Sequence, residues 1–586
     1  MSSKRQTTIA RLCAACAFSA LIVGSSHVRA DETTNALLDL LKSKGAITQT
    51  EYEKIKARQQ AEAKDSAQKL QAAETRAREA EAKAHEAQAK AKEAEAKAQS
   101  DSAEVAKVKA QTLTAADMAI PTKMAPKPPL EYVTVLKKCV GIRVGQVDIC
   151  IKGDISFFGV EQSPNRNLNL PAPINGGLVT TAEHASNSVR GGLLPSSIQV
   201  GISTNQMGWD IGAYFGVYIG GNNINAGFFN QQLPGNPTAL GTAGVDFRQV
   251  FGTIGTPSFG TVKVGRDIGL FASDAILNDL TLFGVGTPLA NFAPSNTTLG
   301  RIGIGYIYAD FIPQITYKSP TWAGLTFWLS AMTPLDEFAF AGPFNSGTMT
   351  AHDLPMGQAK VQYVGTWSPD VKLTLSSSGV IQRHRADCTT TPASCIAEVD
   401  DLNTGNLPGF NPFEGVPGIQ SGTQTTAWAV DGFAMLELWG WNFVAYGYTG
   451  KGVGTTGLFW DGVDVFGNAR HSEGGYLQAA YTFKGGWLLP NALTVGASWG
   501  VSHLETAGPA DNAIELTNCF FATTLAPGAS GTACLVKDNQ SWIGFARYNL
   551  TDWVKLQAEY THTTTENQIG TTIHDDAFAL GTTFFW

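Results

Sequence analysis

The feature that most constrains the fold is a two-residue alternation of apolar and polar side chains in the C-terminal part of the chain. Between Val554 and Tyr560, apolar residues alternate with Lys555, Gln557 and Glu559. The same alternation recurs at 147–157, 477–483 and 493–499. Since successive side chains of a β-strand point to opposite faces, each segment predicts a strand with one apolar and one polar face.

Such segments, about ten residues long, are typical of strands that cross a membrane in a β-barrel. Lipid cannot satisfy open backbone groups, so only a closed barrel carries this pattern through a bilayer. The short connections at 439–440 and 551–552 predict hairpins. We expect an all-β transmembrane barrel of about 16 antiparallel strands over residues 131–586, wide enough for water. A soluble β-sandwich or propeller is the alternative, and the aromatic terminus FFW at 584–586 favours the membrane.

The segment 1–30 has the pattern of a secretory signal peptide. Basic residues at positions 4, 5 and 11 precede an apolar run at 12–24, and Val28-Arg29-Ala30 is suited to cleavage. A buried N-terminal helix is the alternative. The abruptly polar sequence that follows favours the signal peptide.

Export would place the cysteines in a compartment that permits disulfides. Six cysteines lie beyond residue 30, which allows 15 pairings. The most local choice joins Cys388 to Cys395 and Cys519 to Cys534.

Residues 31–119 predict an α-helical arm. Three similar heptads, REAEAKA, HEAQAKA and KEAEAKA, run from Arg78 to Ala98 and place alanines on one stripe. We expect a coiled coil in the periplasm; a solitary helix or a partly disordered spacer is the alternative, because an alanine stripe buries little area. The segment 120–130, IPTKMAPKPPL, predicts an extended proline-rich linker.

Composition and motifs exclude several function classes. The net charge of −8 argues against nucleic-acid binding. A mean hydropathy of −0.05, with an apolar run at 12–24 that is too short to span, argues against a helical membrane protein. No CxxC lies beyond residue 30 and the histidines do not cluster, so we expect no metal site. The chain has no GxSxG motif, and Ser502 and His503 would point to opposite faces of a strand, so we expect neither an enzyme nor a cofactor.

Several segments together resemble the trimeric general diffusion porins of Gram-negative outer membranes. VDICIKGDISFF resembles the family's first strand, and FGTVKVGR, in the segment 247–266, resembles part of a family hairpin. DIGLFASDAILNDLTLFGVG resembles the start of the inward-folded third loop, and 301–306 with 315–320 resembles the strand and turn after it. DDAFALGTTFFW resembles the last strand. The arm resembles that of some phosphate-selective-type porins.

The resemblance implies a water-filled channel for passive diffusion of small hydrophilic solutes and ions, held as a homotrimer in outer-membrane lipid. It also implies that basic residues on the wall face carboxylates on the inward loop, and such fixed charges set ion preference. Carried over by position, Lys152, Arg248 and Arg301 match the basic wall residues and Asp279 matches a loop carboxylate. Asp274 lies beside another acidic position of that loop.

We add Lys263 to this predicted constriction, because it shares a face with Thr261 if Val262 and Val264 point outward. The chain departs from the family at two positions, since Gln199 and Leu282 stand where charged residues are usual. Two alternatives to a general porin stay open at this point. One is a channel specific for an anion or a sugar, and the other is a pore that also contacts peptidoglycan through the arm.

Overall fold

The computed structural model describes 133–136, 139–165, 174–179, 184–222, 245–291, 297–389, 396, 416–486, 490–520 and 534–586, together with Lys44 and Glu53. The chain divides into two compact units, residues 1–128 and 129–586. The predicted signal peptide, coiled coil and linker fall outside the described residues, apart from Lys44 and Glu53. In the described part of the chain, no helix is both long and apolar enough to cross a membrane.

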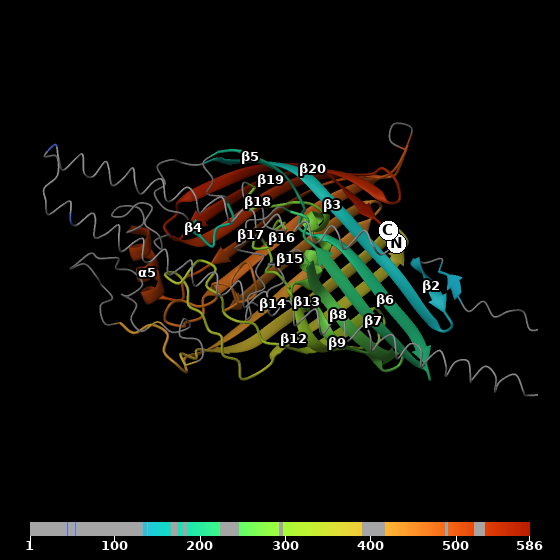
Figure 1. Cartoon of the computed structure of the whole chain (residues 1–586), viewed down its shortest axis with the longest axis horizontal. Helices are drawn as coiled ribbons and strands as arrows, with labels where there is room; N and C mark the ends of the chain where they lie inside the picture. The colour runs from blue at the N-terminus through green and yellow to red at the C-terminus, as the bar shows by residue number, and fades with distance from the viewer. Residues whose placement is uncertain are drawn as a thin grey trace, which may run out of the picture. The chain divides into compact units, whose positions relative to one another are not determined.

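Sixteen strands among the described residues form a closed antiparallel barrel, as the sequence predicts. Each strand pairs with the next one in the list below, and β20 closes the ring on β3, from His574 opposite Asn165 to Phe585 opposite Asp154 (Figure 1). The strands are β3 (Val147–Asn165), β6 (Ser196–Gln206), β7 (Trp209–Ile219), β8 (Val245–Thr256), β9 (Gly260–Ile268), β10 (Phe311–Lys318), β11 (Leu325–Met332), β12 (Met356–Ser368), β13 (Val371–Arg385), β14 (Gln424–Leu438), β15 (Trp441–Lys451), β16 (His471–Phe483), β17 (Leu493–Leu504), β18 (Cys534–Asn549), β19 (Val554–Asn567) and β20 (Thr572–Phe585).

Four shorter strands attach to this ring. β1 (Val133–Val135) pairs with β2 (Val140–Val144), and β2 pairs with the beginning of β3. β5 (Ser186–Arg190) pairs with the second half of β3. β4 (Ile174–Asn175) runs parallel to the beginning of β18.

The two faces of the wall differ as the alternation predicts. On β19, Leu556 and Tyr560 point outward and are 40% and 51% exposed. Gln557 and Glu559 point inward, and each is 3% exposed. Large apolar side chains are likewise exposed on the outside of the other strands, including Ile155, Phe215, Val264, Leu329, Ile381, Leu477 and Leu580. The apolar outer surface suits contact with acyl chains.

The connections at the two ends of the barrel differ in length. β14 and β15 are joined by Trp439 and Gly440 alone, with φ of 48° and 92°. Two positive φ values are typical of the type I′ turn, whose twist matches that of the paired strands. At the opposite end, long loops follow β9, β11 and β15, at 269–310, 333–355 and 452–470.

The loop between β9 and β10, residues 269–310, folds into the barrel and is called here the lumen loop. It contains the helix α3 (Ser273–Asn278) and the 3-10 turn η1 (Leu280–Phe283). Its returning part buries Ile302, Ile304 and Ile307 in one apolar cluster with residues of the 452–470 loop. The sequence prediction of a strand at 301–306 is wrong, because these residues form turns and isolated bridges, and β10 begins only at Phe311.

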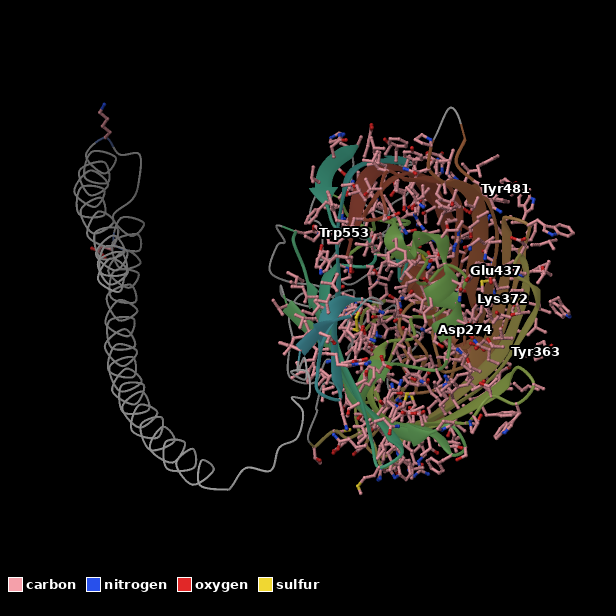
Figure 2. The ribbon with its side chains drawn as sticks, turned by 90° about the vertical axis from the view of Figure 1, so that its right-hand side faces the viewer. Asp274, Tyr363, Lys372, Glu437, Tyr481 and Trp553 are labelled. Atoms are coloured by element: carbon pink, nitrogen blue, oxygen red, sulfur yellow. A yellow bond between two sulfur atoms is a disulfide. The ribbon has the colours of Figure 1, made fainter. Side chains whose placement is uncertain are left out.

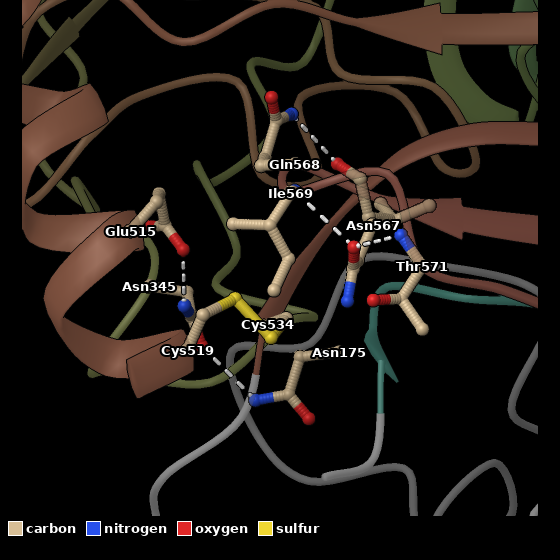
Figure 3. Close-up of a disulfide and its surroundings, with 10 residues drawn as sticks. Asn175, Asn345, Glu515, Cys519, Cys534, Asn567, Gln568, Ile569 and Thr571 are labelled. Atoms are coloured by element: carbon tan, nitrogen blue, oxygen red, sulfur yellow. Dashed lines mark hydrogen bonds between the residues drawn. A yellow bond between two sulfur atoms is a disulfide. The ribbon is translucent and has the colours of Figure 1, made fainter. Parts of the chain in front are cut away.

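Disulfides fix two of the connections. Cys139 is joined to Cys150 across the β2–β3 turn. Cys519 is joined to Cys534 as predicted, and ties the end of α5 (Pro509–Phe520) to the start of β18 (Figure 3). Cys388 is also disulfide-bonded. Cys395, its predicted partner, lies outside the described residues.

Candidate pore constriction

Side chains on strands between β12 and β19 attach the lumen loop to the wall of the barrel. They form hydrogen bonds with the backbone of the loop. Gln358 on β12 accepts from the backbone N–H groups of Leu270 and Phe271, at 2.7 and 2.9 Å. Asp431 on β14 accepts from the N–H of Ala272 at 3.0 Å. These contacts satisfy backbone groups that would otherwise be buried without partners.

The second half of the lumen loop is held in the same way. Gln478 on β16 accepts from the N–H of Leu280 at 3.0 Å and donates to the carbonyl of Asn278 at 3.0 Å. Glu559 on β19 accepts from the N–H groups of Val285 and Gly286. The loop therefore runs from β9 across the lumen to β12–β19.

Asp274, in the first turn of α3, joins the loop to the wall through charge. Its carboxylate lies 2.6 Å from the Lys360 ammonium on β12 and accepts from Gln362 and Ser376 at 3.1 and 2.5 Å. Figure 2 shows Asp274 on the inner side of the strand ring. The structure thus places this predicted carboxylate inside the lumen, in an ion pair with a lysine that the sequence analysis did not single out.

Asp279 and Arg301 come together, as a buried pair within the loop. Both side chains are fully buried, and Arg301 Nε lies 3.9 Å from Asp279 Oδ1. Asp279 also accepts from the backbone and hydroxyl of Thr281 and, at 2.9 Å, from the hydroxyl of Tyr306. Arg301 lies in the lumen loop and not on a strand, so it is not a wall residue. Its Nη1 donates to Ser541 Oγ on β18 at 3.3 Å and so also joins the loop to the wall.

Arg248 and Lys263 each pair with a carboxylate on their own strand. Arg248 on β8 is 4% exposed, and its Nε lies 2.8 Å from Asp246 Oδ2. Lys263 on β9 pairs with Asp267. Val264 is exposed on the outside, which places Lys263 on the inner face as predicted.

Lys152 on β3 lies on the inward face together with the buried Asp154, and its side chain is exposed. It faces a hollow of about 400 Å³ that Gln199, Tyr214 and the Cys139–Cys150 pair also line. Gln199 accepts from the hydroxyl of Tyr214. This part of the wall therefore presents one of the six predicted residues to open space.

A cavity of about 300 Å³ lies between the lumen loop and the near wall, and is called here the loop–wall gap. Arg248 faces the loop–wall gap, but most of the residues that line the gap are apolar or aromatic. Its lining comprises Leu193, Leu194, Gln199, Tyr214, Tyr218, Arg248, Gln249, Ile268, Ile276, Leu277, Leu282, Phe283, Thr297, Tyr308 and Phe311. The gap separates the lumen loop from strands β6 to β10, which lie opposite the strands that hold the loop.

The residues that hold the loop were missed by the sequence analysis, although one signal was present. Glu559 was recognised on the polar face of its strand, and a carboxylate there needs a partner inside the barrel. Lys360 and Gln478 likewise lie on the polar faces of their strands, where a polar side chain needs a partner inside the barrel. Among the described residues, no group of three or more His, Cys, Asp or Glu side chains is placed to hold a metal ion.

Comparisons with known proteins give a similarity to solved outer-membrane channels. No family model matches the sequence, and no curated protein matches it. The outer membrane channel DcaP of Acinetobacter baumannii is 12% identical over 77% of this chain and 99% of its own, with a TM-score of 0.49. An anion-selective porin from Comamonas acidovorans is 10% identical over 75% of this chain and 100% of its own, at 0.44. OmpF of Salmonella typhi in complex with daunomycin is 13% identical over 75% and 98%, at 0.39.

Proposed function

We propose that this chain is an outer-membrane porin, a channel for passive diffusion of small hydrophilic solutes and ions. The observation that supports it most is the closed sixteen-strand ring, with large apolar side chains exposed outside and polar side chains inside. Leucine, isoleucine and phenylalanine side chains exposed on the outside of the strands are costly in water and favourable in lipid. A closed ring satisfies its own backbone within the membrane.

In this proposal the loop–wall gap is the constriction, and Arg248 is the one of the six predicted residues that lines it. Five of the six predicted residues lie in pairs of opposite charge. These pairs are Asp274 with Lys360, Asp279 with Arg301, Arg248 with Asp246, and Lys263 with Asp267. Paired charges produce a weaker field at a distance than separated ones. We therefore propose weak ion selectivity.

Planar-bilayer recording of the purified protein tests the channel. We expect stepwise increases in conductance, since each inserted barrel adds an aqueous path. Heat-modifiable mobility in a gel confirms that the added protein is a folded barrel. A folded barrel that leaves the bilayer silent would contradict the proposal.

A second candidate function is a solute-specific channel. The apolar and aromatic lining of the loop–wall gap supports it, because such surfaces bind solutes selectively where a wide polar lumen does not. This function predicts that one class of solute reduces the ionic current in a saturable way. A general porin shows a current that responds little to solute chemistry.

The arm completes the proposal. The heptads at 78–98 support a coiled coil, and we place it in the periplasm, after removal of the signal peptide at 1–30. A homotrimer of barrels would raise the local concentration of the arms and so stabilise their alanine stripe. The arm would then be placed to contact peptidoglycan.

A further inference from the structure

Two cations are neighbours on the inner wall, on two of the strands that hold the lumen loop. Arg547 on β18 lies directly opposite the inward-pointing Gln557 on β19, so it points inward as well. Lys555 precedes Gln557 by two residues and shares its face. The two cations are therefore diagonal neighbours across the strand pair, about 7–8 Å apart. Their like charges are close enough to repel each other.

No carboxylate pairs directly with either cation in the part of the chain that the structure describes. Arg547 donates from Nε to Gln557 Oε1 at 2.8 Å and from Nη2 to the carbonyl of Leu280 at 3.3 Å. Glu559 is linked to Arg547 only through the amide of Gln557, which donates to it at 3.2 Å. Its other partners are backbone N–H groups of the lumen loop. When ionised, Arg547, Lys555 and Glu559 together carry one surplus positive charge.

Both cations keep a donor that a solute can reach. Among the described residues, Nη1 of Arg547 and Nζ of Lys555 have no hydrogen-bond partner, and neither atom is one of the fully buried polar atoms that lack one. Both residues are only partly buried. The two donors are therefore open to the lumen, between the lumen loop and the short connection at 551–552.

Three phenylalanine rings lie against the cations. Lys555 Nζ is 4.7 Å from the ring centroid of Phe585. The Arg547 guanidinium carbon is 5.8 Å from the ring centroid of Phe283 and 5.5 Å from that of Phe545. The rings of Phe283 and Phe585 pack edge to face at 5.3 Å. Because Phe283 also lines the loop–wall gap, a solute held by the cations lies beside the proposed constriction.

Charge, reach and surroundings together select the kind of solute. A single carboxylate balances the surplus charge, and with a charge-assisted bond of about 2.8 Å at each oxygen it bridges roughly the distance between the two cations. A dianion would leave excess negative charge and lose far more hydration beside the apolar rings. An apolar body attached to the carboxylate gains by contact with the same rings.

We propose that Arg547 and Lys555 form a binding subsite for monovalent organic carboxylates with an apolar body. One carboxylate oxygen accepts from Lys555 Nζ and the other from Arg547 Nη1, and the body packs against Phe283 and Phe585. This inference rests on the proposed channel function and names a solute class that the channel retains.

The test uses benzoate on the full-length protein in planar bilayers. We expect benzoate to reduce the single-channel current in a saturable way. Lys555→Gln removes one donor and its charge, so the half-blocking concentration should rise about tenfold, as expected for one charge-assisted hydrogen bond. Lys555→Arg keeps the charge and the donors and should keep the block.

Lys318→Gln is the matched control. Lys318 lies on the inner face of β10, forms no ion pair with a described residue, and places its Nζ 5.5 Å from the ring centroid of Trp328. It has an aromatic neighbour but no second free cation beside it, so its loss should leave the block by benzoate unchanged. An equal loss of block in Lys318→Gln would assign the effect to the general field of the lumen and overturn the subsite.

Two further solutes test the subsite in the unaltered protein, without any variant. Benzamide has the shape of benzoate without its charge, and sulfate has negative charge without an apolar body. We expect both to block more weakly than benzoate. Equal block by benzamide, stronger block by sulfate, or an unchanged block by benzoate in a folded Lys555→Gln barrel would each overturn the subsite.

Binding of benzoate to the protein in detergent micelles, followed by saturation-transfer NMR, makes the subsite measurable without conduction. Binding that weakens in Lys555→Gln, in a protein that conducts no ions, would support the subsite and contradict the channel. Stepwise conductance without any benzoate binding would support the channel and overturn the subsite.

Discussion

At Asp274, three wall side chains converge on one carboxylate of the lumen loop: Lys360, Gln362 and Ser376. The Asp274 and Lys360 side chains are 13% and 9% exposed. The two charges are therefore largely buried between the loop and the wall, and they cancel there. The hydrogen bonds from Gln362 and Ser376 hold the carboxylate in place independently of the ion pair.

Asp274→Asn should shift the channel toward anions. The amide keeps an oxygen for the hydrogen bonds but leaves the Lys360 charge uncompensated. A unit charge about 8 Å from an ion in water-like surroundings contributes about 0.5 kcal/mol, or roughly a twofold change in permeability ratio. The reversal potential under a salt gradient measures this. Glu437→Gln, the same charge change at an exposed pair with Lys372 near the 439–440 turn, is the control and should shift the potential less.

At the scale of elements, α5 is clamped by a buried arginine from the 452–470 loop. Arg470 donates to both carboxylate oxygens of Asp511 at 2.7 and 2.8 Å, and lies 3.5 Å from Glu515. Asn345 donates to Glu515 at 2.6 Å and accepts from Asn175 at 3.0 Å (Figure 3). Burial raises the pKa of Glu515 from 4.5 to about 8, against the lowering effect of Arg470.

The clamp should loosen as pH rises. Below pH 4.5 Glu515 is protonated whether α5 is docked or released, whereas between about 4.5 and 8 only the released form ionises, so ionisation favours release. Hydrogen exchange of the α5 amides, corrected for intrinsic rates, should show less protection at pH 8 than at pH 5. Glu515→Gln cannot ionise and should flatten this dependence. An equally steep dependence in the variant would assign the effect to another group.

The lumen loop depends on a glycine where it turns back. Gly286 has φ of 56°, and a Cβ there would lie 2.4 Å from the Cα and carbonyl oxygen of Gly300. Gly286→Ala should therefore displace the loop at a cost of about 1–3 kcal/mol. The barrel strands do not depend on this position, so heat-modifiable mobility should persist while the single-channel conductance changes. Gly544→Ala, on β18 with open space around its Cβ, should leave the conductance unchanged.

At the scale of the whole molecule, all sixteen barrel strands lie within the unit 129–586. The ring closes through β20 and β3 without a strand from the first unit. The proposed channel and the predicted arm therefore lie in different units of the chain, and we expect their functions to be separable.

Deleting residues 31–128 behind the predicted signal peptide should leave single-channel conductance unchanged. If the arm contacts peptidoglycan, cells with the truncated protein should release more outer-membrane vesicles than cells with the full chain. Normal vesicle release would dismiss the tether, and lost conductance of a folded truncated barrel would contradict the separation.

The sequence by itself determined the strands and their faces. A two-residue period is a local property, so Gln557 and Glu559 were correctly placed inward and Leu556 outward from their neighbours alone. Other local features predicted the hairpin at 439–440 from its short connection, about 16 strands from the length of the segment, and the Cys519–Cys534 disulfide from the closeness of the two cysteines in the sequence. The strand expected at 301–306 from the resemblance to the porins was wrong, because these residues belong to the returning part of the lumen loop.

Only the tertiary structure decided which charges meet. Asp274 faces Lys360 because ring closure brings β12 opposite the loop that follows β9, and no local pattern records that approach. Arg301 joins Asp279 because the loop doubles back on itself and buries both. Strand pattern follows from the short-range geometry of the backbone, whereas the lining of the lumen depends on how sixteen strands close and how a long loop packs within them.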